Sequence, residues 1–200
     1  MSQRKKEGVR EAILAASFRL FSDLGYSETS IPSIARAAGI STANVYVYFK
    51  SKLDILFTIY EPWLQERLDR LGRSLGRIKS PEKRLQRLLL VVWGELPQEA
   101  NGFANNVIQA LSTAGSGEDY SPHLRQMFQQ RVAGWIEDCL ELSAHESAIL
   151  AGVVLMAFDG FAINVHLAHG LACDPKMVRL FAGVFSNQPA PRRGPRTRRP

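Results

Sequence analysis

The feature that most constrains the fold is a helix-start signal that recurs along the chain. Residues able to cap a helix stand before a proline or an amphipathic stretch at Thr29 or Ser30, Ser41, Ser51, Ser80, Ser121, Ser143 and Asp174. Between these signals, apolar residues recur at the spacing of a helix with one buried face. We find no stretch that alternates apolar and polar residues as a half-buried strand would. The sequence therefore predicts an all-α protein of about nine helices.

The expected helices form a short N-terminal group and a longer C-terminal body. The first group contains helices at about residues 4–22, 31–38 and 42–49, and Ser51 with Asp54 predicts a capping box for a fourth helix. Pro62 lies inside that fourth pattern and predicts a kink or a break. Further helices are expected at about 81–95, 99–113, 122–142, 144–165 and 175–186. Residues 187–200 are rich in Pro, Arg and Gly and are predicted to be a disordered basic tail.

Charge is unevenly distributed along the chain, whose formal net charge is +6. Residues 1–52 carry eight Lys or Arg against four acidic residues, residues 53–186 carry twelve against fifteen, and residues 187–200 carry five Arg and no acid. A basic head and tail around a mildly acidic body favour an anionic polymer as partner. Solvated surface charge alone would account for either end taken singly.

Composition argues against membrane and disulfide-rich classes. The hydrophobic fraction of 46% is that of an ordinary globular protein, and no apolar run reaches the roughly 18 residues needed to span a membrane. The N-terminus passes directly into an amphipathic pattern and lacks the form of a signal peptide. We therefore expect a cytoplasmic protein with no membrane partner. Cys139 and Cys173 are the only cysteines and are expected to be buried thiols.

The stretch from Gly39 to Lys52, GISTANVYVYFKSK, predicts a nucleic-acid interface. The 31–38 helix, a turn through Gly39 and the 42–49 helix make a helix-turn-helix, the arrangement that sets a second helix in the DNA major groove. Val45 and Phe49 lie one turn apart and are expected to face the core. The outward residues are of types that suit base edges and phosphates. They are Thr42, Ala43, Asn44, Tyr46 and Val47.

Lys50 and Lys52 stand at the junction with the fourth helix, where free helix N–H groups also point outward. Positive side chains beside a helix N-terminus form an anion site suited to a backbone phosphate. In the alternative interpretation, Tyr46 and Tyr48 pack in a small helical core with exposed hydroxyls. That interpretation does not explain why Lys50 and Lys52 stand at this junction or why the first helix is basic.

Residues from about 7 to 57 resemble the DNA-binding domain of the TetR family of bacterial transcriptional regulators. The matching pieces are Leu20-Phe21, Gly25-Tyr26, the 29–38 segment with Ile34 and Ala35, the 38–41 turn, and Tyr46, Phe49, Ser51 and Lys52. Ala43 departs from the glycine that is common at its position, and Asn44 stands where a small residue is often found. The resemblance implies a DNA-binding domain at residues 4–52 and a helical ligand-binding and dimerisation domain at 53–186.

The resemblance also implies roles for individual residues in binding double-stranded operator DNA. Thr42, Ala43 and Asn44 match positions that approach bases, and Tyr46, Tyr48 and Lys52 match positions on the DNA backbone. The whole expected set is Ser30, Ser33, Arg36, Ser41, Thr42, Ala43, Asn44, Tyr46, Tyr48, Lys50 and Lys52.

In the body, the stretch LMAFDGFAINVHLAHG resembles the family's penultimate helix, which with the last helix pairs with its copies in a second subunit. The apolar residues there exceed what one intrachain face needs, and small residues permit close helix approach. A homodimer is therefore expected, although a wholly intrachain helix is the alternative. The expected interface is Val153, Ala157, Gly160, Phe161, Val178, Phe181 and Phe185.

The resemblance further implies a small-molecule cavity in each body. Candidate lining residues are mostly apolar with a few polar atoms, so the expected effector is apolar or aromatic. They are Trp63, Trp93, Phe103, Asn106, Gln109, Met127, Phe128, Trp135, Met156, Asn164 and His166. Each of these residues taken singly also fits an ordinary core position.

These features predict a dimeric DNA-binding transcriptional regulator, most simply a repressor that a small molecule releases from its operator. We expect no catalytic residues and no cofactor, because the chain contains no nucleophile motif, phosphate-binding glycine loop or HExxH pattern. His166 and His169 with Cys173 suggest a metal site only weakly, so no metal is expected. The alternatives are an all-α enzyme with an accessory DNA-binding module and a ligand-independent DNA-binding protein.

Overall fold

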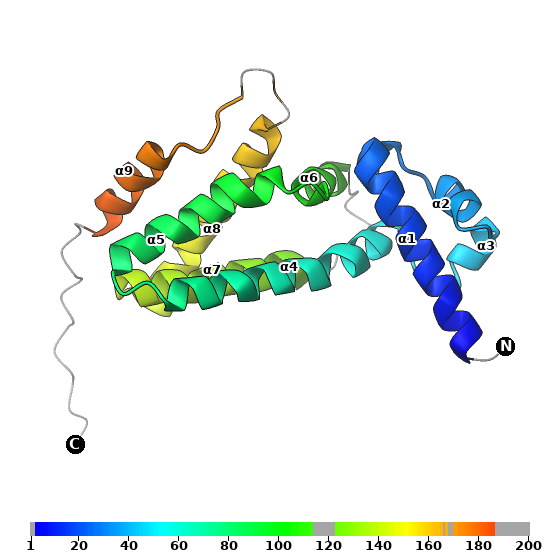
Figure 1. Ribbon diagram of the computed structural model, residues 1–200, viewed down its shortest axis with the longest axis horizontal. Helices are drawn as coiled ribbons and strands as arrows, with labels where there is room; N and C mark the ends of the chain where they lie inside the picture. The colour runs from blue at the N-terminus through cyan, green and yellow to red at the C-terminus, as the bar shows by residue number, and fades with distance from the viewer. Residues whose placement is uncertain (1–2, 114–122, 166, 168–169, 187–200) are drawn as a thin grey trace.

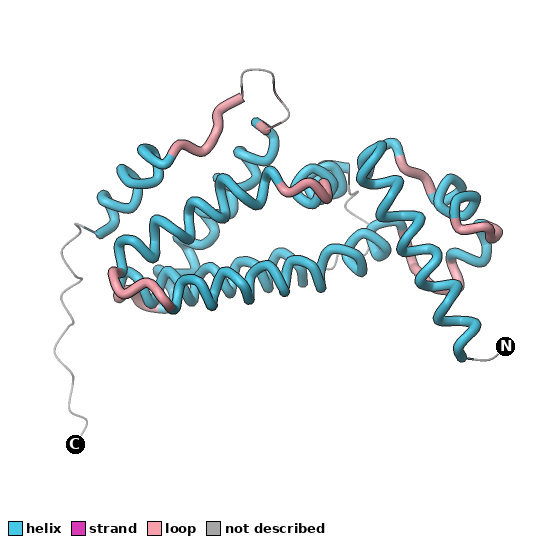
Figure 2. The backbone as a smooth tube through the Cα atoms, in the orientation of Figure 1, coloured by secondary structure: helices cyan, strands magenta, loops and turns pink. Residues whose placement is uncertain are grey.

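The computed structural model describes residues 3–113, 123–165, 167 and 170–186. Within these ranges the ordered elements are all helical, which confirms the predicted fold class (Figures 1 and 2). The N-terminal domain contains α1 (Gln3–Glu28), α2 (Ile31–Ala37) and α3 (Thr42–Val45). The long helix α4 (Lys52–Gly76) leads from this domain to the far end of the body (Figure 1).

The body contains five further α-helices and two shorter helical turns. They are α5 (Pro81–Leu90), the π-helix η1 (Val91–Glu95), the 3₁₀ turn η2 (Leu96–Gln98), α6 (Phe103–Thr113), α7 (His123–Leu140), α8 (Ala144–Asn164) and α9 (Pro175–Ser186). α7 and α8 pack on each other along their lengths, and α6 lies between the body and α1. α6 and α4 are therefore the two helices that join the N-terminal domain to the body (Figure 1).

The predicted caps explain most of the observed helix starts. The Ser30 side chain accepts a hydrogen bond from the Ser33 backbone, and Ser143 with Glu146 forms the expected capping box of α8. Ser51 caps α4, but the Asp54 carboxylate accepts from the backbone N–H of Lys50, one residue earlier than in a standard box. The expected start at Ser121 lies outside the described residues.

Two glycines with positive φ shape the N-terminal domain. Gly25 has the non-helical angles φ 83° and ψ 167°, so the regular helix is interrupted there, close to its predicted end, and a further helical turn beyond the kink extends α1 to Glu28. Gly39 has φ 70° and turns the chain between α2 and α3. A side chain at either position would be strained, because the left-handed region favours glycine.

Three details of the body differ from the predictions. α4 continues through Pro62, whose ring is exposed, so the carbonyl that Pro62 leaves without a donor can be hydrated. The helix from Pro81 widens into the π-helix η1 and then tightens into the 3₁₀ turn η2, and α6 begins at Phe103, later than expected. Arg67 on α4 binds Glu95 at 2.9 Å and Glu99 at 2.8 Å, which holds these turns against α4.

α8 is long and apolar enough to cross a membrane by length and composition, which differs from the sequence expectation. In the sequence, Asp159 divides the apolar stretch of α8, so neither uninterrupted part reaches the length needed to span a membrane. In the structure 39% of the apolar window is buried against other helices. The core helix of a soluble protein can have the same length and apolar composition. These features therefore indicate that α8 is apolar around much of its circumference.

Candidate nucleic-acid interface and effector pocket

A small apolar core sets the angle between α1, α2 and α3. Ile13 and Phe21 of α1, Ile34 of α2, and Val45 and Phe49 at α3 are almost completely buried in one cluster. Val45 and Phe49 therefore face the core as the sequence predicts. The guanidinium of Arg10 lies 5.4 Å from the centre of the Phe49 ring, which places a cation beside this segment that the sequence analysis did not select.

The segment predicted as the 42–49 helix is less regular than expected. α3 proper is one turn, Thr42–Val45, which the Ser41 side chain caps by accepting from the backbone N–H of Asn44 at 3.2 Å. The chain then continues in hydrogen-bonded turns, with Tyr48 N–H donating to Val45 O at 3.0 Å and Phe49 N–H to the same oxygen at 3.1 Å. These bonds keep the backbone coiled as far as Phe49. Val45 and Phe49 are therefore buried, while Tyr46 and Val47 between them are exposed.

Several of the predicted DNA-contacting side chains lie at the surface of this domain. Tyr46 is 55% exposed and Val47 is 72% exposed, and no described helix covers them. The remaining exposed members are Ser30, Arg36, Ser41, Ala43 and Lys50, while Ser33, Thr42, Asn44 and Tyr48 are half-buried. Ser30, Ser33 and Ser41 also use their hydroxyls to cap α2 and α3. An exposed tyrosine and valine beside small polar groups form a surface suited to a partner.

Lys52 differs from the expectation of an outward phosphate contact. Its Nζ donates to Tyr26 O and to Thr29 O, each at 2.7 Å, and lies 4.0 Å from the centre of the Tyr26 ring. This lysine therefore satisfies the carbonyls at the end of α1 and fastens α4 to the α1–α2 junction. Lys50 is exposed, so it is the lysine of the pair that the fold leaves for an external anion.

An apolar hollow lies between α4, α6, α7 and α8, and we call it the effector pocket after the role expected from the sequence. About 390 Å³ of empty space lies at this hollow when the open solvent at its mouth is counted, and the space closed in by the side chains is far smaller. It is lined by Phe57, Leu64, Phe103, Val107, Leu111, Leu124, Arg125, Phe128, Leu155, Phe158 and Asp159. Arg125 and Asp159 are the charged members, and Arg125 Nη2 lies 2.9 Å from Asp159 Oδ2. Such a mostly apolar cavity with convergent polar groups is typical of a small-molecule site.

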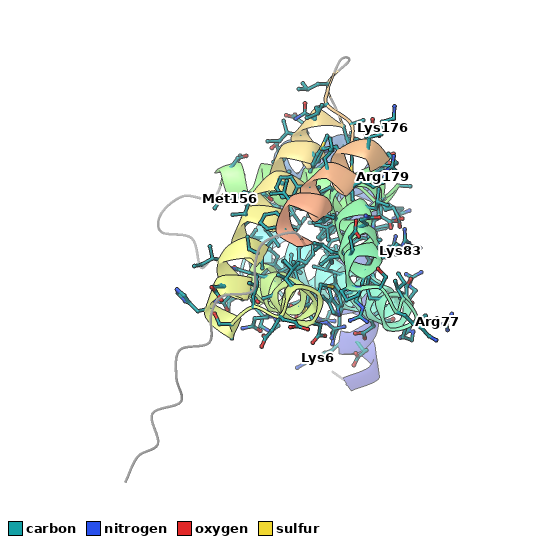
Figure 3. The ribbon with its side chains drawn as sticks, turned by 90° about the vertical axis from the view of Figure 1, so that its left-hand side faces the viewer. Lys6, Arg77, Lys83, Met156, Lys176 and Arg179 are labelled. Carbon is teal, nitrogen blue, oxygen red and sulfur yellow. The ribbon has the colours of Figure 1, made fainter. Side chains whose placement is uncertain are left out.

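Of the eleven residues predicted to line a cavity, Phe103 and Phe128 line this pocket. Trp93 and Asn164 lie instead at a separate hollow near the end of α8, where the Trp93 indole donates to Val154 O. Met156 is 68% exposed and does not line either hollow (Figure 3). The other described candidates do not line the effector pocket; they are Trp63, Asn106, Gln109, Met127 and Trp135. His166 lies outside the described residues.

Two polar side chains of α6, those of Asn106 and Gln109, form hydrogen bonds to α1. Asn106 Nδ2 donates to Phe21 O at 3.1 Å and to the Tyr60 hydroxyl at 3.0 Å, and Gln109 Oε1 accepts from Ser27 N–H at 2.9 Å. Burial raises the pKa of Tyr60 to about 12, although the hydrogen bond from Asn106 opposes this. Because Phe103, on the same helix, lines the effector pocket, α6 contacts both the pocket and the N-terminal domain.

Exposed apolar residues of α8 and α9, the yellow and orange helices in Figure 3, form a set that we call the α8–α9 face. It consists of exposed residues at helical spacing: Ile149, Val153, Met156 and Ile163 on α8, and Leu180, Phe181 and Val184 on α9. Of the predicted dimer residues, Val153 and Phe181 belong to it, and Ala157, Gly160 and Phe185 are half-buried. Phe161 and Val178 do not fit, because they are buried within the subunit. Phe161 stacks on Trp93 with ring centres 5.8 Å apart.

The fold and the surface define a helix-turn-helix DNA-binding domain joined to a helical body with a pocket. Residues 13–59 match the model of the family described as bacterial regulatory proteins, tetR family. The matched segment runs from α1 into the first turns of α4, so this part of the chain is similar to the DNA-binding domain of that family.

Individual relatives agree with this assignment. The HTH-type transcriptional regulator HbdR of Aromatoleum sp. (strain CIB) is 37% identical over 84 residues, which cover 42% of this chain and 35% of that protein. The match to this curated relative thus spans about a third of its length. FadR of Bacillus subtilis, solved in complex with stearoyl-CoA, is 16% identical with a TM-score of 0.59 and covers 88% of this chain and 97% of that one.

A second solved structure has a similar fold. A putative transcriptional regulator from Saccharomonospora viridis, solved in complex with choline, is 24% identical with a TM-score of 0.58 and covers 88% of this chain and 94% of that chain. At these identities, both structures establish that the body shares their helical fold. What they bind is a property of those proteins.

Proposed function

We propose that this protein is a dimeric, sequence-specific DNA-binding transcriptional regulator of the cytoplasm that represses its target until a small molecule releases it. The observation that carries the proposal is the uncovered surface of α3 and the turns after it, within a domain similar to that of the TetR family. Tyr46 and Val47 there are exposed although a solvated surface would favour more polar groups. Base edges and phosphates in a major groove would cover them.

A dimer is part of the proposal because one α3 segment contacts too few bases to specify a site. Two copies related by a twofold axis read half-sites about 34–36 Å apart. The α8–α9 face supplies an apolar surface for that twofold contact.

Release by a small molecule would follow from the position of α6 and α4. Both helices line the effector pocket, and both contact the N-terminal domain: α6 through Asn106 and Gln109, α4 through Lys52. A molecule that fits the pocket better in one arrangement of α4 and α6 shifts the population toward that arrangement. The spacing of the two α3 segments then changes with it.

The proposal is tested by selecting binding sites from random DNA with the purified protein and then assaying release. We expect a palindromic site and a small molecule that raises the melting temperature and also dissociates that site. Asn44→Ala should alter the selected sequence, since each base-edge contact discriminates by about 1–3 kcal/mol. Enrichment of no sequence over several rounds would contradict the proposal.

A further inference from the structure

The effector pocket contains a charged pair, Arg125 and Asp159, which can favour some ligand end groups over others. Arg125 on α7 and Asp159 on α8 meet side by side, with Nη2 and Oδ2 2.9 Å apart and Nη1 and Oδ1 3.4 Å apart. Both side chains are partly buried, with 37% and 31% of their surfaces exposed. Both belong to the lining of the effector pocket, whose other described members are all apolar.

We propose that the Arg125–Asp159 pair selects an uncharged effector, an apolar or aromatic molecule with one hydroxyl or carbonyl at the end that meets the pair. The inference rests on the proposed function in taking this pocket as the effector site. It assigns Arg125 and Asp159 as the specificity-determining residues of that site.

Arg125 and Asp159 have unused hydrogen-bonding capacity that suits a hydroxyl or carbonyl group of a ligand. A guanidinium has five N–H donors and a carboxylate has about four acceptor sites, and each partner uses two of them in this pair. Within the described part of the chain, neither side chain makes a further hydrogen bond. Arg125 can therefore donate to a ligand oxygen, and Asp159 can accept from a ligand hydroxyl, while the pair stays intact.

Charged ligand ends fit this arrangement poorly. A carboxylate that binds Arg125 must displace Asp159 or share the guanidinium with it, which leaves one negative charge uncompensated beside apolar walls. An ammonium that binds Asp159 leaves Arg125 uncompensated in the same way. An uncharged end avoids both costs, because it adds hydrogen bonds without changing the charge of the site.

Two further side-chain pairs join α7 to α4 and lie outside the described pocket lining. His123 at the start of α7 lies 2.9 Å from Glu61 of α4, but neither residue lines the pocket. Arg131 and Asp69 also pair between α7 and α4, away from the lining. The Arg131–Asp69 pair therefore offers a matched control on the same helix as Arg125.

The experiment measures how binding depends on ligand charge in wild type and in variants. Two matched series serve as probes: 2-naphthylmethanol, 2-naphthoate and 2-naphthylmethylamine, and octanol, octanoate and octylamine. Binding to the full-length protein is followed by thermal shift and calorimetry. We expect the alcohol of at least one series to bind wild type at least about tenfold more tightly than the acid or the amine.

The variants should change this order in opposite directions. Asp159→Asn leaves Arg125 unpaired and should make the acid the preferred ligand, and Arg125→Gln leaves Asp159 unpaired and should make the amine preferred. The double variant Arg125→Gln/Asp159→Asn should again prefer the alcohol, which keeps the test valid if one single variant folds poorly. Arg131→Gln should leave the wild-type order unchanged.

Several outcomes would overturn the inference. They are equal binding of acid and alcohol by wild type, no binding of either series, or an order that stays the same in both single variants. Release of operator DNA is measured separately. The predicted order of binding without operator release would support the selection by Arg125 and Asp159 and would contradict the regulatory role of the pocket.

Discussion

Lys50 and Lys52 are two residues apart, yet the fold gives them different tasks. Lys52 reaches across to Tyr26 O and Thr29 O, whereas Lys50 remains exposed. The sequence predicted both as phosphate contacts, because the pattern of charges near a helix start is the same for both. The difference arises from the packing of α4 against the end of α1, which residue type and spacing do not reveal.

Substituting each lysine by methionine separates the two tasks. Lys52→Met should lower the free energy of unfolding by about 1–3 kcal/mol, because two partly buried carbonyls lose a charged donor. Lys50→Met should leave stability unchanged, weaken binding to all DNA, and reduce the salt dependence by about one unit of slope. Denaturant titration and binding at several salt concentrations check both. A stable Lys52→Met protein with weak DNA binding would restore the original assignment of Lys52.

The two cysteines should differ in reactivity. Burial raises the pKa of Cys139 to about 11, with the charge of Arg84 lowering it and that of Asp138 raising it. At pH 8 about one Cys139 in a thousand would then be thiolate, the reactive form. The pKa of Cys173 is also raised by burial, but Cys173 is half-exposed. We expect iodoacetamide to modify Cys173 first and Cys139 only on unfolding, as peptide mass spectrometry would show; equal rates in the folded protein would contradict this.

At the scale of elements, local signals predicted helix starts well and helix interiors poorly. The caps of α2, α4, α5 and α8 depend on a side chain and a backbone group three residues apart, so the sequence contains the whole interaction. Arg67 of α4 donates hydrogen bonds to Glu95, the last residue of η1, and to Glu99 just after η2, so these turns contact a distant part of the chain. Burial tends to lower the pKa of Arg67, but hydrogen bonds to the two glutamates outweigh it and raise the pKa. No local pattern encodes such a contact.

The capping box of α8 predicts a pH dependence of stability. The Ser143 hydroxyl and backbone N–H both donate to the Glu146 carboxylate, at 2.6 Å and 2.9 Å, and lower its pKa. A lowered pKa in the folded state means that the stabilisation is present above the unfolded pKa of about 4.3 and is lost as pH falls through the folded pKa. Wild type should therefore melt above Glu146→Ala at pH 7, with a gap that narrows toward pH 3.

Glu137→Ala, which removes an exposed glutamate of α7, is the matched control for this measurement. Its melting temperature should stay close to that of wild type across the same pH range. A gap for Glu146→Ala that is equally large at pH 7 and pH 3 would show that the carboxylate charge plays no part in the cap.

At the scale of the whole molecule, the predicted fold class is confirmed, and two of the eleven candidate lining residues, Phe103 and Phe128, line the effector pocket. Aromatic and sulfur-containing residues were chosen by type, and type does not say which helices are neighbours. Leu64, Val107 and Leu155 line the effector pocket because α4, α6 and α8 meet there, although nothing distinguishes them from other core residues in the sequence. Arg125 and Asp159 were missed for the same reason: their pairing across α7 and α8 exists only in the folded chain.

The α8–α9 face gives the last prediction, which concerns assembly. Leu180 is 75% exposed and Val184 is 64% exposed, one turn apart on α9, so each can be changed without opening the core of the subunit. Leu180→Asp/Val184→Asp should place two charges in an apolar contact between copies and yield folded monomers with weak operator binding. Leu24→Asp, at an exposed apolar residue of α1, should leave the assembly unchanged. Sedimentation velocity measures both, and an intact dimer in the double variant would move the interface away from α9.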